Sequence, residues 1–181
     1  MAFSTDDSVW DRFLAEWPLE RLRTMTLQEY TQAGDKHCFT NWMEGGLDQY
    51  GSIWGGSAFK FGIYSRNEHS LKQGDTAIAY DADYGWYRRF GLTHDEAFEN
   101  VRKEVVAVAE ASRAGRLTDI DDSELGPTYR WKIAFHYQDR SRADLFPCVF
   151  LRPPLLHACG FPNSDKSTPL SGLYARAASL R

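Results

Sequence analysis

The chain has 181 residues, 43% of them hydrophobic and 14% aromatic, and its formal net charge is -4. This is enough material for one compact domain with a buried core. The net charge argues against a strongly basic, non-specific DNA-binding protein. Residues 126–181 nevertheless carry eight basic and three acidic residues. Positive charge is therefore concentrated locally, which leaves room for a polyanion site.

The sequence predicts neither a membrane protein nor a disulfide framework. No apolar run reaches transmembrane length, and the first ten residues are acidic and polar, unlike a signal peptide. The cysteines Cys38, Cys148 and Cys159 are odd in number and irregularly spaced, which is typical of buried thiols. We therefore expect a cytoplasmic protein that does not contact a membrane.

The first quarter of the chain predicts a layer of short helices. Ser8 can cap a first helix that ends at Pro18, and Thr26 with Glu29 forms a capping box for a second. A third helix is expected over residues 36–43. The aromatic residues of this layer are expected to be core.

Strands are expected next, over residues 58–64, 76–80 and 85–90. The longest helix should follow from Thr93 to about Ala114, where Gly115 closes it. Its apolar stripe, which includes Val101, Val105 and Val108, is expected to pack on the sheet.

The last third predicts more strands and two further helices. Residues 129–138 alternate with period 2, with Trp131 on one face and Lys132 and His136 on the other, and residues 145–150 are their expected hairpin partner. Pro153-Pro154 starts a brief helix ending at Gly160, and a last amphipathic helix begins near Leu170.

The predicted fold class is α+β, with a mostly antiparallel sheet that is either open or partly closed into a barrel. The N-terminal helical layer and one long helix would pack against it. Residues 1–162 are expected to form a single domain, and residues 163–181 a linker and the start of a C-terminal helix.

The most informative segment is residues 51–64, in which four glycines alternate with four aromatic residues around Lys60. Glycines let a backbone turn or approach a ligand closely, and aromatic faces stack on flat rings. Trp54 and Tyr64 bracket a loop that leads into a strand and can wall a pocket for a planar group. A glycine-bent strand with its rings in the core is the equally supported alternative.

No set of residues predicts catalysis or a cofactor. The Asp/Glu-x-Lys triplet of metal-dependent nucleases is missing, and the lysine of residues 56–62 is misplaced for a P-loop. Ser57 lies in no complete nucleophile elbow, and Cys148, His157 and Cys159 lack the spacing of a zinc site. We expect no catalytic residues, no metal and no cofactor in this chain.

Several segments together resemble the N-terminal specificity region of McrB-like AAA+ restriction proteins. The likeness extends over about residues 13–160, and its most specific part is Gly-Ser-Ile-Trp-Gly-Gly-Ser, residues 51–57. It includes Lys-Phe-Gly-Ile-Tyr at 60–64, Trp86-Tyr87 and Trp-Lys-Ile-Ala-Phe at 131–135. Such regions recognise modified DNA, in some relatives by base flipping, while a downstream GTPase motor and a partner nuclease cut it.

The resemblance implies a DNA-binding specificity domain of a type IV, McrBC-like restriction system in anti-phage defence. Its partners would be DNA carrying a modified base and the AAA+ motor and nuclease subunit of that system. Unpaired bases are held by stacking on aromatic side chains that have cationic side chains nearby. The candidate base-binding residues are Trp54, Ser57, Tyr64 and Trp86, and the candidate phosphate-binding residues are Lys60, Arg66, Arg88, Arg89 and Lys132.

Two other functions stay open at the level of the sequence. The chain could be a protein-interaction or oligomerisation module of a defence ATPase, with its aromatic residues in the core. It could also be a hydrolase of a small molecule or nucleotide, if Ser57, His136 and nearby acids converge.

Overall fold

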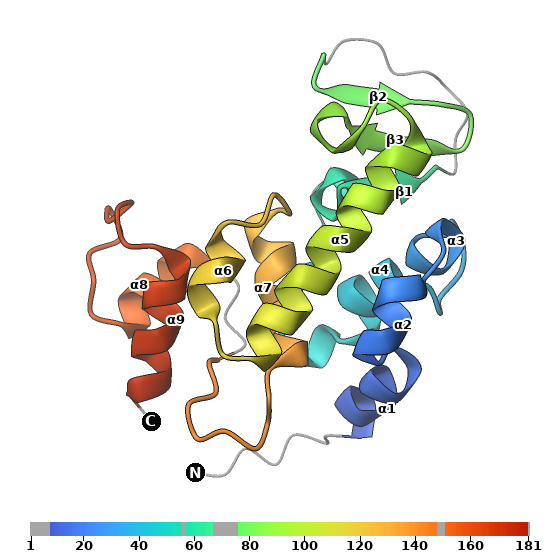
Figure 1. Cartoon of the computed structure of the whole chain (residues 1–181). Helices are drawn as coiled ribbons and strands as arrows, with labels where there is room; N and C mark the ends of the chain where they lie inside the picture. Colours follow the sequence, from blue (N-terminus) through green and yellow to red (C-terminus); the bar gives the residue numbers. More distant parts are fainter. Residues whose placement is uncertain (1–7, 56, 67–75, 148–150, 181) are drawn as a thin grey trace. The chain divides into compact units, whose positions relative to one another are not determined.

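The computed structural model describes residues 8–55, 57–66, 76–147 and 151–180 (Figure 1). The chain divides into two compact units, residues 1–103 and 104–181. The division falls inside the long helix α5 (His94–Arg113), and the boundary expected at residue 162 lies inside the second unit. None of the described helices is both long and apolar enough to cross a membrane.

Short helices make up the N-terminal part of the first unit, as expected. They are α1 (Ser8–Glu16), α2 (Leu19–Thr24), α3 (Leu27–Tyr30), α4 (Phe39–Asn41), the π-helix η1 (Trp42–Gly46) and the 3₁₀ helix η2 (Asp48–Tyr50). The capping box is confirmed, because Thr26 accepts a hydrogen bond from the Glu29 N–H and the Glu29 carboxylate accepts one from the Thr26 N–H.

Aromatic side chains form the core of this helical layer. The rings of Trp17, Tyr30 and Phe39 are fully buried, with centroids 5.3 Å apart for Trp17 and Phe39 and 6.0 Å apart for Tyr30 and Phe39. The Tyr30 hydroxyl donates to the Phe61 carbonyl at 2.6 Å, which ties the layer to the segment before the sheet. The expectation that these rings are core is confirmed.

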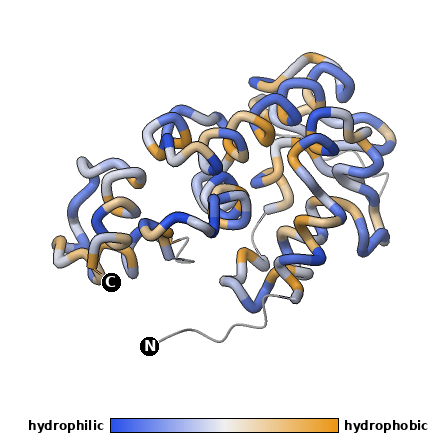
Figure 2. Tube along the Cα trace, turned by 60° about the horizontal axis from the view of Figure 1, so that its bottom comes forward, coloured by the Kyte–Doolittle hydropathy of each residue, from blue (hydrophilic) through white to orange (hydrophobic). Residues whose placement is uncertain are grey.

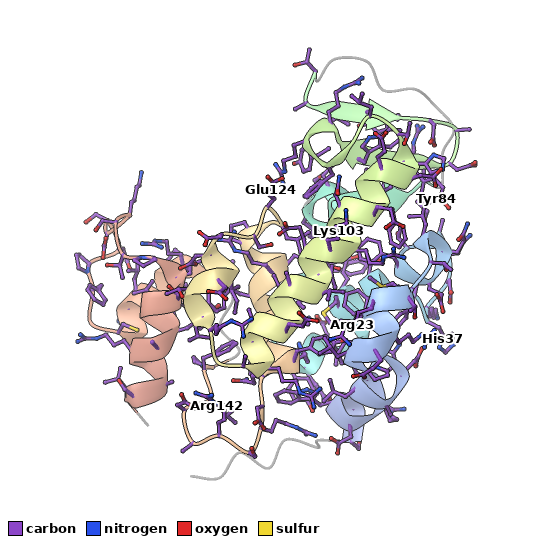
Figure 3. All side chains as sticks on the ribbon, viewed as in Figure 1. Arg23, His37, Tyr84, Lys103, Glu124 and Arg142 are labelled. Atoms are coloured by element: carbon purple, nitrogen blue, oxygen red, sulfur yellow. The ribbon has the colours of Figure 1, made fainter. Side chains whose placement is uncertain are left out.

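The sheet is small, antiparallel and open. It consists of β1 (Ile63–Ser65), β2 (Ile78–Tyr80) and β3 (Tyr84–Tyr87), in the order β1-β3-β2; Tyr84, where β3 begins, is labelled in Figure 3. The fold class is thus α+β. The expectations of a mostly β structure and of a partly closed barrel are wrong, because the described chain is mainly helical and its three strands do not close on themselves.

Two of the expected strands are shorter than predicted because their ends coil into 3₁₀ helices. These are η3 (Ala58–Phe61), which precedes β1, and η4 (Arg88–Phe90), which follows β3. Alternation of side chains had suggested extended backbone through both segments. In η3 the Ser57 hydroxyl accepts a hydrogen bond from the Phe59 N–H and starts the helical turn.

The bounds and the buried stripe of helix α5 match the prediction, but Val105 and Val108 of that stripe belong to the second unit and not to the unit that holds the sheet. The Thr93 hydroxyl accepts from the Glu96 N–H at 3.2 Å, and Ala97, Val101, Val105 and Val108 are buried. In the first unit, Asn100 donates to the Phe90 carbonyl at 2.7 Å and the Phe98 ring lies 5.8 Å from Tyr30. Alternating hydrophilic and hydrophobic colours along the helices in Figure 2 show this amphipathic pattern.

The second unit, as described, is helical. After the end of α5 it contains α6 (Leu117–Asp121), α7 (Pro127–Tyr137), α8 (Arg152–Ala158) and α9 (Leu170–Ser179). The brief helix after residue 152 and the last helix are confirmed. Cys159 donates to the Leu173 carbonyl at 3.3 Å and the Trp131 and Tyr174 rings lie 4.1 Å apart, so residues beyond 163 pack within this unit.

The largest error concerns residues 129–138, which form helix α7 and not a strand. All residues from Trp131 to Tyr137 are buried, so neither a period of 2 nor one of 3.6 separates a polar face from an apolar face. The local signal for this helix is Gly126-Pro127, because proline at the first position favours a helix start. The expected hairpin partner is also missing: residues 145–147 form no strand, and residues 148–150 lie outside the described part.

Candidate functional site

Residues 51–55, at the start of the glycine-rich segment, form a loop that is held by one lysine. Lys60, on η3, donates from Nζ to the carbonyls of Ile53 at 2.8 Å and Gly55 at 2.9 Å, and it forms an ion pair with Glu44 of η1. Three acceptors use the three donors of an ammonium group. The Lys60 side chain is only 17% exposed, so its charge is directed at the loop rather than at solvent.

Trp54 is an exposed residue of this loop. The residue is 75% exposed, whereas the preceding Ile53 is buried. The Trp54 N–H donates to the Ser52 hydroxyl at 3.1 Å, and Gly55 has φ 85°, a left-handed conformation that favours glycine. The backbone carbonyls of the residues before and after Trp54 are both hydrogen-bonded to Lys60. The exposed Trp54 ring can therefore serve as a surface on which a flat group stacks.

Ser57 has a structural role in this loop. Its hydroxyl accepts from the Phe59 N–H at 3.3 Å and starts η3, and its residue is exposed. Trp54, Ser57 and Lys60 thus lie close together in the sequence, but Trp54 is exposed, whereas the Lys60 ammonium binds backbone carbonyls and Glu44.

One face of the sheet carries three half-buried tyrosines, Tyr64, Tyr80 and Tyr87, which we call the tyrosine face. Tyr64 and Tyr80 both lie opposite Gly85, and Tyr87 follows on the same side two residues later. Phe59 of η3 packs between them, with ring centroids 5.0, 5.8 and 5.1 Å from Tyr64, Tyr80 and Tyr87. The sequence had suggested only Tyr64 of these.

Gly85 permits this arrangement. A Cβ atom at residue 85 would lie 2.9 Å from Tyr80 Cδ1 and 3.0 Å from Tyr64 Cε1, closer than side-chain carbons normally approach. The two rings therefore close over the glycine from both neighbouring strands.

Three predicted phosphate-binding arginines flank the tyrosine face. The Arg66 guanidinium lies 4.9 Å from the Tyr80 ring centroid and donates to the Asp81 carbonyl at 2.6 Å. Arg89 lies 4.5 Å from the Tyr87 centroid, and exposed Arg88 donates through Nε to the Ile78 carbonyl at 3.1 Å. Guanidinium groups stacked on aromatic rings at an exposed edge present both positive charge and flat surface.

Tyr64 also lines a pocket of about 150 Å³ between η3, β1 and the helical layer. Buried Thr31, Cys38, Thr40 and Phe61 line it, together with the more exposed polar residues Gln32, Asp35, Asn41 and Glu44. A cavity of about this volume can take up one six-membered ring. Burial raises the pKa of Tyr64, and the neighbouring Tyr80 raises it further, so the Tyr64 hydroxyl stays protonated at neutral pH and can donate a hydrogen bond.

The pocket and the loop are joined through Glu44. This carboxylate lines the pocket and binds the same Lys60 ammonium as the Ile53 and Gly55 carbonyls. Groups that share one ammonium lie within about 6 Å of each other. The backbone on either side of Trp54 is therefore next to the pocket wall.

Two of the predicted site residues, Trp86 and Lys132, are buried. Trp86 is 4% exposed on the opposite face of the sheet beside buried Ile63 and Ala79, and its indole N–H donates to the Gly91 carbonyl at 3.0 Å. Lys132 belongs to α7 of the second unit and is fully buried. His136, four residues later, is also fully buried and donates from Nδ1 to the Lys132 carbonyl at 2.7 Å.

Sequence reasoning missed Glu44, Phe59, Tyr80 and Tyr87. Tyr87 was visible as the neighbour of Trp86 on the other side of an alternating strand, but the remaining three depend on contacts between distant segments. Among the described residues, no group of His, Cys, Asp or Glu side chains is arranged to hold a metal ion. Comparison with protein-family models, with curated proteins and with solved structures gives no match to this chain.

Proposed function

We propose that this chain is a DNA-recognition domain that reads a modified base in the cytoplasm as part of a type IV, McrBC-like restriction system. An AAA+ motor and a nuclease subunit would then carry out cleavage. The observation that carries the proposal is the double position of Tyr64, which belongs both to the polar pocket and to the tyrosine face flanked by arginines.

In this proposal the flat surfaces hold bases and the arginines hold the backbone. Trp54 is the outermost stacking group, because its ring is exposed on a tied loop beside the pocket. Tyr64 and the amides of Gln32 and Asn41 supply donors and acceptors for a base edge. Arg66, Arg88 and Arg89 would contact phosphates. Trp86 and Lys132 have no part in it because both are buried.

The test is a binding titration with DNA duplexes that differ only in one modified base, using wild-type protein and Trp54→Ala. Loss of one base stack costs about 1–3 kcal/mol, so Trp54→Ala should weaken binding to the preferred duplex roughly 5- to 150-fold. Trp54→Phe should retain most of the affinity. Leu92→Ala, at another exposed apolar side chain of the same unit, is the matched control and should bind like wild type.

Two outcomes would count against the proposal. If the wild-type protein binds all duplexes with equal affinity, it does not recognise a modified base. If Trp54→Ala keeps its DNA preference but loses assembly with another protein, the interaction-module alternative would be favoured, since exposed tryptophans are also common at the centres of protein interfaces.

A further inference from the structure

Lys60 binds three groups that come from two separate segments of the chain. The Ile53 and Gly55 carbonyls belong to the glycine-rich loop, and Glu44 belongs to η1. The Lys60 ammonium also lies 5.0 Å from the Phe61 ring centroid, and Phe61 is a buried residue of the pocket lining. One side chain thus holds the loop carbonyls on both sides of Trp54.

We propose that the Glu44–Lys60 pair is a clamp that sets the position of Trp54, and that Lys60 is a positioning residue rather than a phosphate contact. The inference rests on the proposed function for its effect on DNA, but the clamp itself can be tested without DNA. With the clamp closed, the Ile53 and Gly55 carbonyls are held in place before a ligand arrives, so binding loses less conformational entropy.

The charge pattern supports a positioning role. A lysine that contacts phosphate must extend its ammonium to the surface, whereas Lys60 is 17% exposed and its partner Glu44 is 26% exposed. A phosphate approaching this ammonium would also meet the Glu44 carboxylate beside it. Arg88 and Arg89, in contrast, are exposed and stand at the edge of the tyrosine face.

The first experiment measures the loop alone, by the rate of chymotrypsin cleavage after Trp54 in the full chain. Lys60→Met removes all three hydrogen bonds, so cleavage after Trp54 should accelerate about fivefold or more relative to cleavage elsewhere in the chain. Glu44→Gln leaves the carbonyl bonds in place and should give a smaller increase. Lys103→Met is the matched control, because Lys103 is an exposed lysine of α5 in the same unit, labelled in Figure 3.

The second experiment measures DNA binding as a function of salt. If Lys60 positions Trp54, Lys60→Met lowers the preference for the modified duplex about fivefold or more and leaves the slope of log K against log salt unchanged. If Lys60 contacts a phosphate, that slope falls by about 0.9 and the preference stays as it was. Arg88→Ala provides the reference for the second behaviour.

Unchanged cleavage after Trp54 in both Lys60→Met and Glu44→Gln would overturn the clamp. So would a reduced salt slope in Lys60→Met with wild-type cleavage. Should Lys60→Met fail to fold, the same two measurements on Glu44→Gln test the clamp: the rate of cleavage after Trp54 and the preference for the modified duplex. Faster cleavage in a protein whose wild type shows no preference for any duplex would confirm the clamp and remove the proposed function.

Discussion

Two segments of this chain mix aromatic and basic residues in nearly the same way, and they have opposite environments. Residues 84–91 contain strand β3 and the 3₁₀ helix η4, and their Arg88 and Arg89 are exposed beside the tyrosine face. Residues 129–137 form a helix in which Lys132 and His136 are fully buried. The composition of a segment therefore does not tell whether its cations meet solvent. Backbone conformation and burial determine whether these cations are exposed to solvent.

The largest expected effect contrasts Trp131 of the buried helix α7 with the exposed Trp54 of the glycine-rich loop. Trp131→Ala should destabilise the protein by about 3–5 kcal/mol, because the ring is fully buried against Phe146 and Tyr174. Trp54→Ala should change the free energy of unfolding by no more than about 0.5 kcal/mol, because its ring is exposed. Urea denaturation measures both. Similar losses in the two variants would show that Trp54 is packed in the folded protein.

The buried histidine should make stability depend on pH. Burial lowers the pKa of His136 to about 3, and nearby Lys132 adds to the effect while the hydrogen bond to the Lys132 carbonyl opposes it. In the unfolded chain the pKa is about 6.5, so below that pH the unfolded state takes up a proton that the folded state does not. Stability should then fall by about 2 kcal/mol from pH 6.5 to pH 5, and level off near pH 3.

His136→Gln should lack this part of the pH dependence. The quantity to compare is the difference between the wild-type and variant unfolding free energies over pH 4–7, since carboxylates shared by both proteins cancel in it. A difference that does not vary with pH would mean that His136 is protonated as easily in the folded as in the unfolded chain.

Replacing a glycine of the tyrosine face by alanine should destabilise the protein, whereas the same replacement in the second unit should not. Gly85→Ala would push a Cβ atom into the rings of Tyr64 and Tyr80, and overpacking of this kind costs about 1–3 kcal/mol. Gly172→Ala in α9 is the matched control: its nearest contact would be 3.6 Å away, and alanine favours helix by about 0.5–1 kcal/mol. Thermal unfolding of the two variants should shift in opposite directions.

The smallest expected effect is on binding alone. Arg88→Ala should leave stability nearly unchanged, weaken modified and unmodified duplexes equally, and reduce the salt slope by about 0.9. Arg142→Ala, which removes an exposed arginine paired with Asp144 in the second unit, should alter neither affinity nor slope. If Arg88→Ala and Arg142→Ala have equal effects on DNA affinity and salt slope, the tyrosine face is not the DNA-binding surface.

Features specified by neighbouring residues could be predicted from the sequence. The Thr26–Glu29 capping box, the stripe of α5 and the proline-marked start of α8 at Arg152-Pro153 each depend on residues within a few turns. Helix α7 could not be predicted from periodicity, because burial on all sides removes the amphipathic pattern.

The candidate site was only partly predictable for a related reason. Trp54, Tyr64 and the flanking arginines lie in segments with an unusual composition. The role of Lys60 depends on Glu44, sixteen residues earlier, and the tyrosine face depends on the register that sets Tyr64 and Tyr80 opposite Gly85. A sequence gives residue types along one segment, whereas these features arise from pairings between segments.

The closure of two tyrosine rings over Gly85 has a consequence for recognising relatives of this chain. Residues 64, 80 and 85 share one volume, so their sizes should covary: a homologue with a larger residue at the position of Gly85 should carry a smaller one at the position of Tyr64 or Tyr80. A glycine paired with two distant aromatic residues would thus be a better signature of this sheet than the glycine-rich loop, because such loops occur in many unrelated folds.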